Sequence, residues 1–479
     1  MADLLRTSLG AFNWFVLSYF LVLNAIYLVL LVLASRTILG GRGRPDGPSC
    51  DDIFANPFTP PISVVMSAYN EELGVVESAR AALDLEYPEI EVVVVDDGST
   101  DATFDRLQDA FDLVEVAPAI EQDVPVNGAV RSVHVPRAGE PLVVVRKVNT
   151  SRRADGVNAG INAARHPLVC CVDADSILER DALLRVVRPF IEDPERVVAS
   201  GGVIRPVNGS TVHRGELTEV RQPKGWIPRI QVVEYVRAFL LGRTGWSRAQ
   251  GLLIISGAFG LFRRDVLVEV GGYDPTSIGE DADLVAKIHR ATRDAGRDAR
   301  IVYVPDPVCW TEVPSTRHDL AKQRRRWSAG LFGVLRKQKG MIGRPRYGRI
   351  GLVVLPYFLA FELLGPVVEL VGVVAVVVGL ATGAVDPPFA VLFLLVAVMF
   401  GVLLSVASLV LEEISFHRYT RWVDLRASVL AAVLENLGFR QMHAWWRLKG
   451  LIDGVTDPGK SWGELTRTGF QDEAGAATR

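Results

Sequence analysis

The chain has 479 residues, of which 49% are apolar and 22% charged, and its formal net charge is −3. Its length exceeds one typical domain, and a mean hydropathy of +0.24 indicates a membrane component. No basic excess is present to neutralise a phosphate backbone, so the composition argues against nucleic acid as a partner. The four cysteines lack the paired spacing of a zinc site, and we expect reduced cytoplasmic thiols.

The first predicted element is a membrane-spanning helix, which we place within residues 1–40. Residues 11–34 are mostly apolar and uncharged, and about 20 such residues cross a bilayer as a helix. Arg6 is the one basic residue before this stretch, whereas several arginines follow it closely. This asymmetry of basic residues places the following region in the cytoplasm. Residues 40–60, rich in Gly, Pro and Asp, are typical of a linker.

From residue 61 the pattern becomes that of an α/β domain, assigned to residues 41–315. Strand, helix and strand follow one another, which predicts parallel strands joined by right-handed crossovers. Residues 112–140 are expected to be a variable surface insertion without a chemical role. The expected strands are 62–67, 90–95, 142–145 and 168–172, and the expected helices are 71–85 and 154–164.

Two of these strands end in carboxylates. Asp96 and Asp97 follow the second strand, and Asp173 and Asp175 stand where the fourth strand ends. The carboxyl edge of a parallel sheet is where such folds bind ligands. Because side chains at i and i+2 of a strand project to one face, Asp173 and Asp175 would present their oxygens together. Such a pair suits Mg²⁺ or Mn²⁺ completed by nucleotide phosphates, and a turn or cap is the alternative explanation.

Two later stretches belong to the same domain. Residues 252–260 predict a buried strand that breaks into small residues around Gly257, the kind of place where a backbone approaches a ligand closely. A helix is expected over 278–290, with Glu280 and Asp281 at its N-terminus. Helix capping and dipole complementarity are the alternative explanation of these acidic residues.

Two amphipathic or basic stretches are predicted at the membrane interface. Residues 230–241 carry an apolar stripe but are too short and too charged to span, and an ordinary amphipathic core helix is the open alternative. Residues 317–340 are strongly basic, which favours an anchor against anionic lipid, and we assign 316–349 to this interfacial helix. Within it, Trp327 next to arginines offers a stacking face beside phosphate-binding groups.

Two further spans are expected within residues 350–411. Residues 350–380 cross once, with an excess of length that permits a tilt or kink. Glu362 and Glu369, seven residues apart, fall on one helical face and should face a polar interior. Residues 389–411 form the next span.

The remaining segment, 412–479, is predicted to stay on the cytoplasmic side. Basic residues after the last span favour this side, and they favour an interfacial or re-entrant segment at 429–439 over a fourth crossing. The polar end after Gln471 is expected to be disordered. The first of these basic residues are His417, Arg418, Arg421 and Arg426.

Five motifs occur in the order seen in membrane-embedded family 2 glycosyltransferases. They are AYNEE at 68–72, VDDGS at 95–99, VDADS at 172–176, GED at 279–281 and QRRRW at 323–327. Over about residues 61–327 the chain resembles this family, which includes synthases of hyaluronan, cellulose and poly-N-acetylglucosamine. The resemblance implies an α/β fold of the GT-A type, with a mixed, mostly parallel sheet that binds a nucleotide sugar, beside an α-helical transmembrane region. It also implies a hexosyltransferase that uses a UDP-sugar and Mg²⁺ or Mn²⁺.

The resemblance also assigns roles to residues. Arg152 and Arg153 stand where the family commonly has a Gly-Lys pair, and Arg153 is expected to serve the diphosphate. The remaining roles are the uridine site at Tyr69, Glu71 and Asp97, the metal ligand Asp175 with Asp173 against the ribose or metal, the acceptor-facing Ser256 and Gly257, the general base Asp281 beside Glu280, and the diphosphate and acceptor contacts of Gln323, Arg326 and Trp327.

The chemistry agrees with these roles. Inverting transfer needs a base for the acceptor hydroxyl, which Asp281 could supply, and neutralisation of the leaving diphosphate, which a metal with Arg153 and Arg326 could supply. We predict a processive synthase in the cell membrane that polymerises a UDP-sugar of the N-acetylglucosamine or glucose type on the cytoplasmic face and passes the glycan through its own helices. Growing glycan or lipid would be the acceptor, with accessory export proteins as candidate partners. A transferase that adds one sugar to a lipid and a non-catalytic receptor for UDP-sugars are the alternatives.

Overall fold

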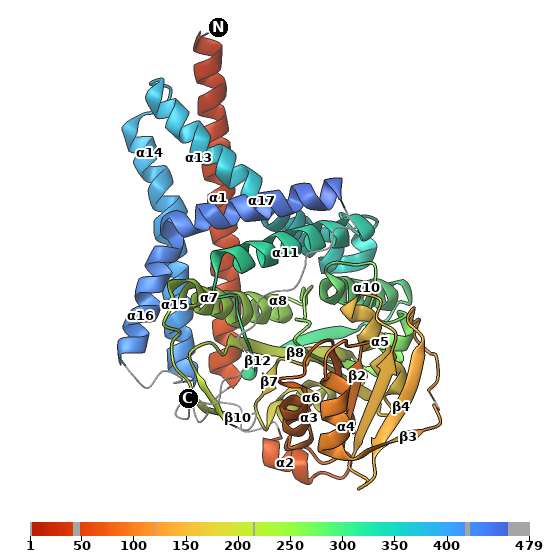
Figure 1. Cartoon of the computed structure of the whole chain (residues 1–479). Coiled ribbons are helices and arrows are strands. Elements are labelled where there is room, and N and C mark those ends of the chain that lie inside the picture. The colour runs from red at the N-terminus through yellow and green to blue at the C-terminus, as the bar shows by residue number, and fades with distance from the viewer. Residues whose placement is uncertain (1, 42–47, 119, 214–215, 417–421, 458–479) are drawn as a thin grey trace. The chain divides into compact units, whose positions relative to one another are not determined.

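The computed structural model describes residues 2–41, 48–118, 120–213, 216–416 and 422–457 (Figure 1). The chain forms two compact units. Among the described residues, a helical unit comprises 2–41, 222–249 and 314–457, and an α/β unit comprises 48–221 and 250–313. The segment 222–249 therefore groups with the helices, whereas the sequence pattern counted it with the α/β domain.

The α/β unit is built on a ten-stranded mixed sheet with the strand order β3-β4-β5-β2-β1-β6-β11-β8-β12-β7. Its centre, β5-β2-β1-β6, is parallel as predicted, and β8 and β12 form a second parallel pair. The strands are β1 (Ile62–Ala68), β2 (Ile90–Asp96), β3 (Leu113–Val116), β4 (Val130–Pro136), β5 (Leu142–Lys147), β6 (Leu168–Asp173), β7 (Ile177–Leu178), β8 (Val197–Pro206), β11 (Phe259–Arg263) and β12 (Arg300–Thr311), with a separate hairpin of β9 (Thr211–His213) and β10 (Glu216–Glu219).

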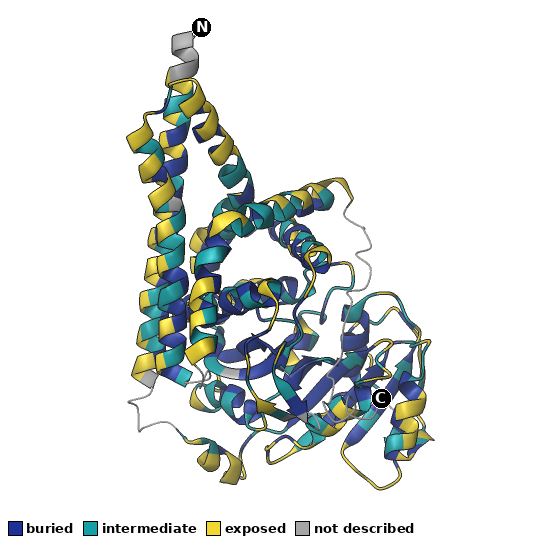
Figure 2. Ribbon diagram, turned by 60° about the vertical axis from the view of Figure 1, so that its left-hand side comes forward, coloured by how far each residue is buried: buried dark blue, intermediate teal, exposed yellow. Residues whose placement is uncertain are grey.

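The central strands are buried because they are runs of β-branched residues with both faces covered. Residues 92–95 of β2 are all valines and are fully buried. Figure 2 shows strands of the sheet in the dark blue of buried residues. The helices of this unit are α2 (Cys50–Ala55), α3 (Val75–Leu83), α4 (Thr103–Phe111), α5 (Arg153–Ala163), α6 (Ala182–Glu192), α9 (Arg264–Glu269) and α10 (Glu280–Asp294).

Helix α5 packs unusually close to β1 because it presents glycines to the strand. A Cβ atom at Gly160 would lie 2.3 Å from Cγ1 of Val65, and one at Gly156 would lie 2.2 Å from Oγ of Ser67. Any larger residue would push the helix away from the sheet. This close packing fixes the N-terminal turn of α5, which carries Arg153 and Asp155.

Three further predictions from the sequence pattern differ from the structure. Residues 112–140 are not a mere surface insertion, because β3 and β4 in this stretch extend the sheet by antiparallel pairing and Val124 is fully buried. The helix expected from residue 71 begins at Val75, since Asn70 has a φ of +56° and the chain turns before the helix. The strand expected over 252–260 begins later in the structure. It is β11, which starts at Phe259 after the small residues, where Phe259 pairs with Val172 of β6.

The strand register brings the ends of β1, β2 and β6 to one edge of the sheet. Ala68 lies opposite Asp96, and Ser67 lies opposite Asp173. The residues that follow these strands therefore gather at the carboxyl edge, where parallel sheets bind ligands.

The helical unit begins with α1 (Ala2–Gly41). Of the helices that the structure describes, Thr7–Gly40 is long and apolar enough to cross a bilayer, and the bent pair Ile350–Leu363 and Gly365–Ala381, which meet at 43°, passes as a second span if counted together. The other elements of this unit are α7 (Trp226–Tyr235), η1 (Val236–Arg243), α8 (Thr244–Arg248), α11 (Arg317–Lys337), η2 (Pro345–Tyr347), η3 (Ile350–Val354), α12 (Leu355–Tyr357), η4 (Phe358–Leu363), α13 (Gly365–Ala381), α14 (Pro387–Leu394), η5 (Leu395–Met399), α15 (Phe400–Phe416), α16 (Trp422–Leu434), η6 (Glu435–Phe439) and α17 (Arg440–Thr456).

The remaining membrane predictions fall on the later helices. The expected span 389–411 lies in the run α14-η5-α15 and stays a prediction. Residues 429–439 contain a kink, where Leu437 and Gly438 depart from helical geometry. His417, Arg418 and Arg421 lie outside the described residues, as does the chain end from residue 458.

The stretch 230–241 lies in α7 and η1, and its polar side chains are not on a solvated face. Gln231 is fully buried and donates to the carbonyl of Pro314 at 2.7 Å. Arg237 forms a 2.5 Å ion pair with Glu435. Within this unit the stretch therefore packs on both sides, which favours the core-helix interpretation over an interfacial one.

Candidate active site

The candidate site lies at the carboxyl edge of the sheet in the α/β unit. Tyr69 and Glu71 follow β1, Asp97 follows β2, and Asp173 ends β6. Tyr69 is 41% exposed, which leaves its ring open to a ligand. Gly98 makes the turn after Asp97 with a φ of +69°, and a Cβ atom there would lie 2.7 Å from the backbone nitrogen of Asn149.

Arg153 joins several of the predicted site residues. Its Nε and Nη2 atoms each lie 2.5 Å from Oδ1 of Asp173, and Nη2 also donates to the carbonyl of Gly257 at 2.7 Å. Its Nη1 atom lies 3.8 Å from Oε1 of Glu280. Although burial opposes the charged form, Asp173 and Glu280 raise the pKa of Arg153. The guanidinium is thus directed at the protein's own carboxylates and acceptor-facing loop.

Asp281 closes the same network from the N-terminus of α10. Its Oδ2 atom accepts from the backbone N–H of Gly257 at 3.3 Å, and its Oδ1 atom accepts from the N–H of Ala282 at 2.8 Å. Ser256 belongs to the same turn, where its carbonyl accepts from Phe259 N–H at 3.1 Å. The predicted base, the acceptor-facing loop and the first aspartate of the Asp-x-Asp pair are therefore neighbours.

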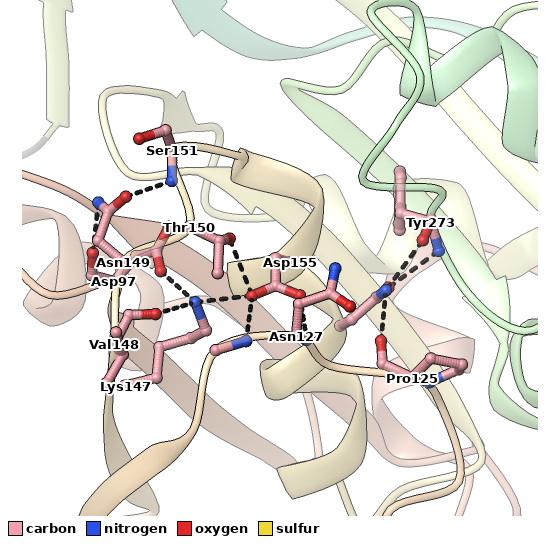
Figure 3. Close-up of polar contacts among 12 residues, drawn as sticks. Asp97, Pro125, Asn127, Lys147, Val148, Asn149, Thr150, Ser151, Asp155 and Tyr273 are labelled. Atoms are coloured by element: carbon pink, nitrogen blue, oxygen red, sulfur yellow. Dashed lines mark hydrogen bonds and ion pairs between the residues drawn. The ribbon is translucent and has the colours of Figure 1, made fainter.

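A lysine that the sequence analysis did not select supports the uridine side of the site. Lys147, at the end of β5, is fully buried, and Figure 3 shows its ammonium between Asp97 and Asp155. The Nζ atom lies 2.5 Å from Oδ1 of Asp97, 2.8 Å from the carbonyl of Val148 and 2.9 Å from Oδ2 of Asp155. The position was detectable, because Lys147 ends a parallel strand at the same edge that marked Asp97.

The two carboxylates beside Lys147 differ in pKa. Burial raises the pKa of Asp97 to about 6, although the hydrogen bond from Lys147 works in the opposite direction. Burial also disfavours ionised Asp155, but hydrogen bonds from the N–H of Asn127, from Lys147 and from the N–H of Gly128 outweigh it and lower its pKa. Asp155 is therefore the permanent counter-ion, and Asp97 is the carboxylate that can exchange a proton.

The carboxylates at this edge suit a divalent cation whose coordination shell is completed by a bound ligand. Within the described ranges, no cluster of three or more His, Cys, Asp or Glu side chains forms a complete metal site. Asp173 is 30% exposed at its side chain but shares Oδ1 with Arg153. Asp175 lies two residues on and is half-buried. Because Mg²⁺ and Mn²⁺ take one or two carboxylates and complete their shell with phosphate and water, this pair is a sufficient protein contribution.

Three of the predicted residues belong to the helical unit. Gln323 is buried on α11, while Arg326 and Trp327 are exposed. Arg324 lies over the ring of Trp327, 4.4 Å from its centroid, and pairs with Glu234 at 2.7 Å. The contact of Gln323, Arg326 and Trp327 with a diphosphate or acceptor stays a prediction.

The mixed sheet and the carboxylates at its edge define an enzyme domain of the GT-A glycosyltransferase class. The family model described as glycosyltransferase like family 2 matches residues 60–330. The chain therefore belongs to this family.

Relatives and solved structures agree with the assignment. Poly-beta-1,6-N-acetyl-D-glucosamine synthase of Staphylococcus epidermidis is 29% identical over 274 residues, which are 57% of this chain and 55% of the relative. The synthase of the same name from Staphylococcus aureus strain COL is 27% identical over 274 residues, with the same shares of 57% and 55%. The chain thus spans about half the length of the curated relatives it matches.

Among solved structures, the mannosyltransferase PcManGT from Pyrobaculum calidifontis, in complex with GDP-Man and Mn²⁺, superposes with a TM-score of 0.52 at 21% identity. This match covers 89% of this chain and 99% of that one. At this identity the likeness concerns the fold.

Proposed function

We propose that the chain is an inverting glycosyltransferase that polymerises a UDP-activated sugar, of the N-acetylglucosamine or glucose type, into a β-linked polysaccharide. The observation that carries the proposal is the network in which Arg153 joins Asp173 to Gly257, and Gly257 in turn contacts Asp281. It sets a carboxylate for the acceptor hydroxyl beside carboxylates that can hold the donor. The name of the relatives, poly-beta-1,6-N-acetyl-D-glucosamine synthase, supports the substrate class.

In this proposal Asp281 accepts the proton of the acceptor hydroxyl as that oxygen attacks the anomeric carbon. The N–H of Gly257 holds the carboxylate in place. Asp175, with Asp173, would hold Mg²⁺ or Mn²⁺, which supplies positive charge to the leaving diphosphate. Tyr69, Glu71 and Asp97 hold the uridine, and Gln323, Arg326 and Trp327 contact the diphosphate and acceptor sugar.

The proposed location is the cell membrane, with several spans and the α/β unit in the cytoplasm. The apolar helix Thr7–Gly40 and the bent pair that begins at η3 support it. Processive synthesis, passage of the glycan through the helices and accessory export proteins belong to the same proposal. A transferase that adds one sugar to a lipid is the second candidate, because few of the described helices qualify as spans.

The test of the base is Asp281→Asn in the full-length protein in detergent. Transfer should fall by about 10²–10⁴-fold, as expected for loss of a general base, while UDP binding stays close to that of the wild type. Asp294→Asn, at the exposed far end of α10, is the matched control and should keep full transfer. Transfer at the wild-type rate by the Asp281 variant would overturn the base assignment.

Product size separates the two candidates. Radiolabelled UDP-N-acetylglucosamine and UDP-glucose, incubated in turn with the protein and Mg²⁺ or Mn²⁺, should give a ladder or polymer from one of them. A single labelled glycolipid would instead favour addition of one sugar.

A further inference from the structure

Lys147 is a fully buried charged group next to the proposed donor site, and the mechanism above does not use it. An ammonium has three N–H donors, and here they meet three acceptors: Asp97, Asp155 and the carbonyl of Val148. The lysine has no exposed surface and no donor left for a ligand. It therefore acts through the carboxylates that it holds.

The two carboxylates are satisfied to different degrees. Asp155 accepts from Asn127 N–H at 2.7 Å, from Gly128 N–H at 3.0 Å and from the Thr150 hydroxyl at 3.0 Å, besides Lys147. Asp97 accepts only from Lys147, through Oδ1, and no described residue donates to its Oδ2 atom. Oδ2 is thus the oxygen that a ligand can use.

The protonation of Asp97 decides what this oxygen can recognise. An ionised carboxylate is an acceptor only, whereas a carboxylic acid also donates. Uracil presents a ring N–H on the edge where cytosine presents a bare ring nitrogen. An ionised Asp97 therefore accepts from uracil and repels the lone pair of cytosine, while a protonated Asp97 can donate to cytosine.

We propose that Lys147 is a positioning residue that keeps Asp97 as an acceptor and so selects uracil over cytosine in the donor nucleotide. This inference rests on the proposed uridine role of Asp97. The charged groups that face Asp97 are Lys147 from β5, Asp155 from α5 and its neighbour Asp96. Lys147 is the one cation among them, so its removal leaves two neighbouring carboxylates, Asp155 and Asp96, that favour a proton on Asp97.

The experiment compares binding of UDP-glucose and CDP-glucose to the full-length protein in detergent, by calorimetry, from about pH 5 to about pH 8. These two probes differ in the base alone, and their diphosphate diesters do not titrate in this range. The wild type should prefer UDP-glucose near pH 8 and lose this preference as the pH falls through the pKa of Asp97, about 6. Lys147→Met should lower the preference at least about tenfold at neutral pH, by weakening UDP-glucose and not CDP-glucose.

A purely structural lysine would weaken both probes by the same factor. Lys287→Met is the matched control, because this lysine also donates to a backbone carbonyl, that of Gly272, at 2.6 Å in the same unit. It should leave the ratio of the two affinities unchanged. An unchanged ratio in Lys147→Met overturns the inference, and if that variant does not fold, a wild-type ratio that is constant across the pH range overturns it.

Asp97→Asn distinguishes failure of the inference from failure of the proposed function. An amide can both donate and accept, so this variant should lose the preference for uracil at every pH. If Asp97→Asn lowers the ratio and Lys147→Met does not, the inference alone fails. If neither changes it, Asp97 does not read the base and the proposed uridine site fails as well.

Discussion

Arg153→Lys tests whether this arginine serves the diphosphate or positions the site. The family that the sequence resembles commonly carries lysine at this place, and lysine binds phosphate well as a point charge. A residue that only contacts the diphosphate would therefore tolerate the change. The structure directs the guanidinium instead to Asp173, Gly257 and Glu280, which a single ammonium cannot reach together.

The size of the effect follows from these contacts. An ammonium could take the place of Nη2, which contacts both Asp173 and the Gly257 carbonyl, but lysine has no counterpart of the Nε–H that also donates to Asp173. Loss of one hydrogen bond to a charged group costs about 1.5–3 kcal/mol, and the side chains of Arg153 and Asp173 are 27% and 30% exposed, which favours the lower half of that range. About 2 kcal/mol corresponds to a decrease of about 30-fold in kcat/KM.

The assay is the initial rate of UDP release as a function of donor and of Mg²⁺ or Mn²⁺ concentration. We expect kcat to fall and the apparent metal affinity to change, because Asp173, a proposed metal ligand, loses the hydrogen bond from Nε of Arg153. Arg185→Lys is the matched control, since its 2.6 Å pair with Asp181 has similar exposure, 25% and 29%, outside the network. Wild-type kcat in Arg153→Lys, with at most a raised donor KM, would refute the positioning role.

Three other substitutions test the packing and the charges. Gly156→Ala should lower the unfolding free energy by about 1–3 kcal/mol, because its Cβ would lie 2.2 Å from Oγ of Ser67, and adding Ser67→Ala should recover most of the thermal stability; no recovery would contradict this contact. Gly450→Ala should lower the melting temperature in detergent, since its Cβ would lie 2.3 Å from a backbone carbonyl of α11, whereas Gly333→Ala, with open space around it, should not. Asp155 has a lowered pKa in the fold, so the stabilisation that it gives to the fold is present above the ordinary aspartate pKa of about 4 and is lost as the pH falls. The melting temperature of Asp155→Asn should therefore depend less on acid pH than that of the wild type. An unchanged acid profile would contradict the assignment.

The sequence was sufficient for the parallel centre of the sheet and for the carboxylates at its edge. Valine runs specify the strands, and Asp97 and Asp173 follow strands that the register aligns. Lys147 was overlooked because a lysine at the end of an apolar strand is normally solvated. Its burial depends on Asp155, which comes from the next helix, and this proximity exists only once α5 packs on β1.

Strands β3 and β4 were missed for a different reason. The stretch between them is rich in Pro, Gly and charged residues, which is typical of a surface loop. β4 pairs antiparallel with both β3 and β5, and β3, the edge strand, has only 4 residues, which is too short for a clear alternating pattern. Local sequence could not reveal pairing that depends on the neighbouring strand β5.

In the helical unit, two glutamates seven residues apart pair with two arginines that are also seven residues apart. Glu362 and Glu369 were expected to face a polar interior, and the structure pairs Arg447 with Glu362 at 3.1 Å and Arg440 with Glu369 at 3.0 Å. The two glutamates are seven residues apart, and so are the two arginines. The later arginine pairs with the earlier glutamate, so α17 runs antiparallel to η4 and α13. A carboxylate in an apolar helix is costly unless it is paired, and breaking such a pair costs more than the pair contributes. The two arginines therefore tie α17 to the bent helices, and any membrane arrangement of η4 and α13 must include α17.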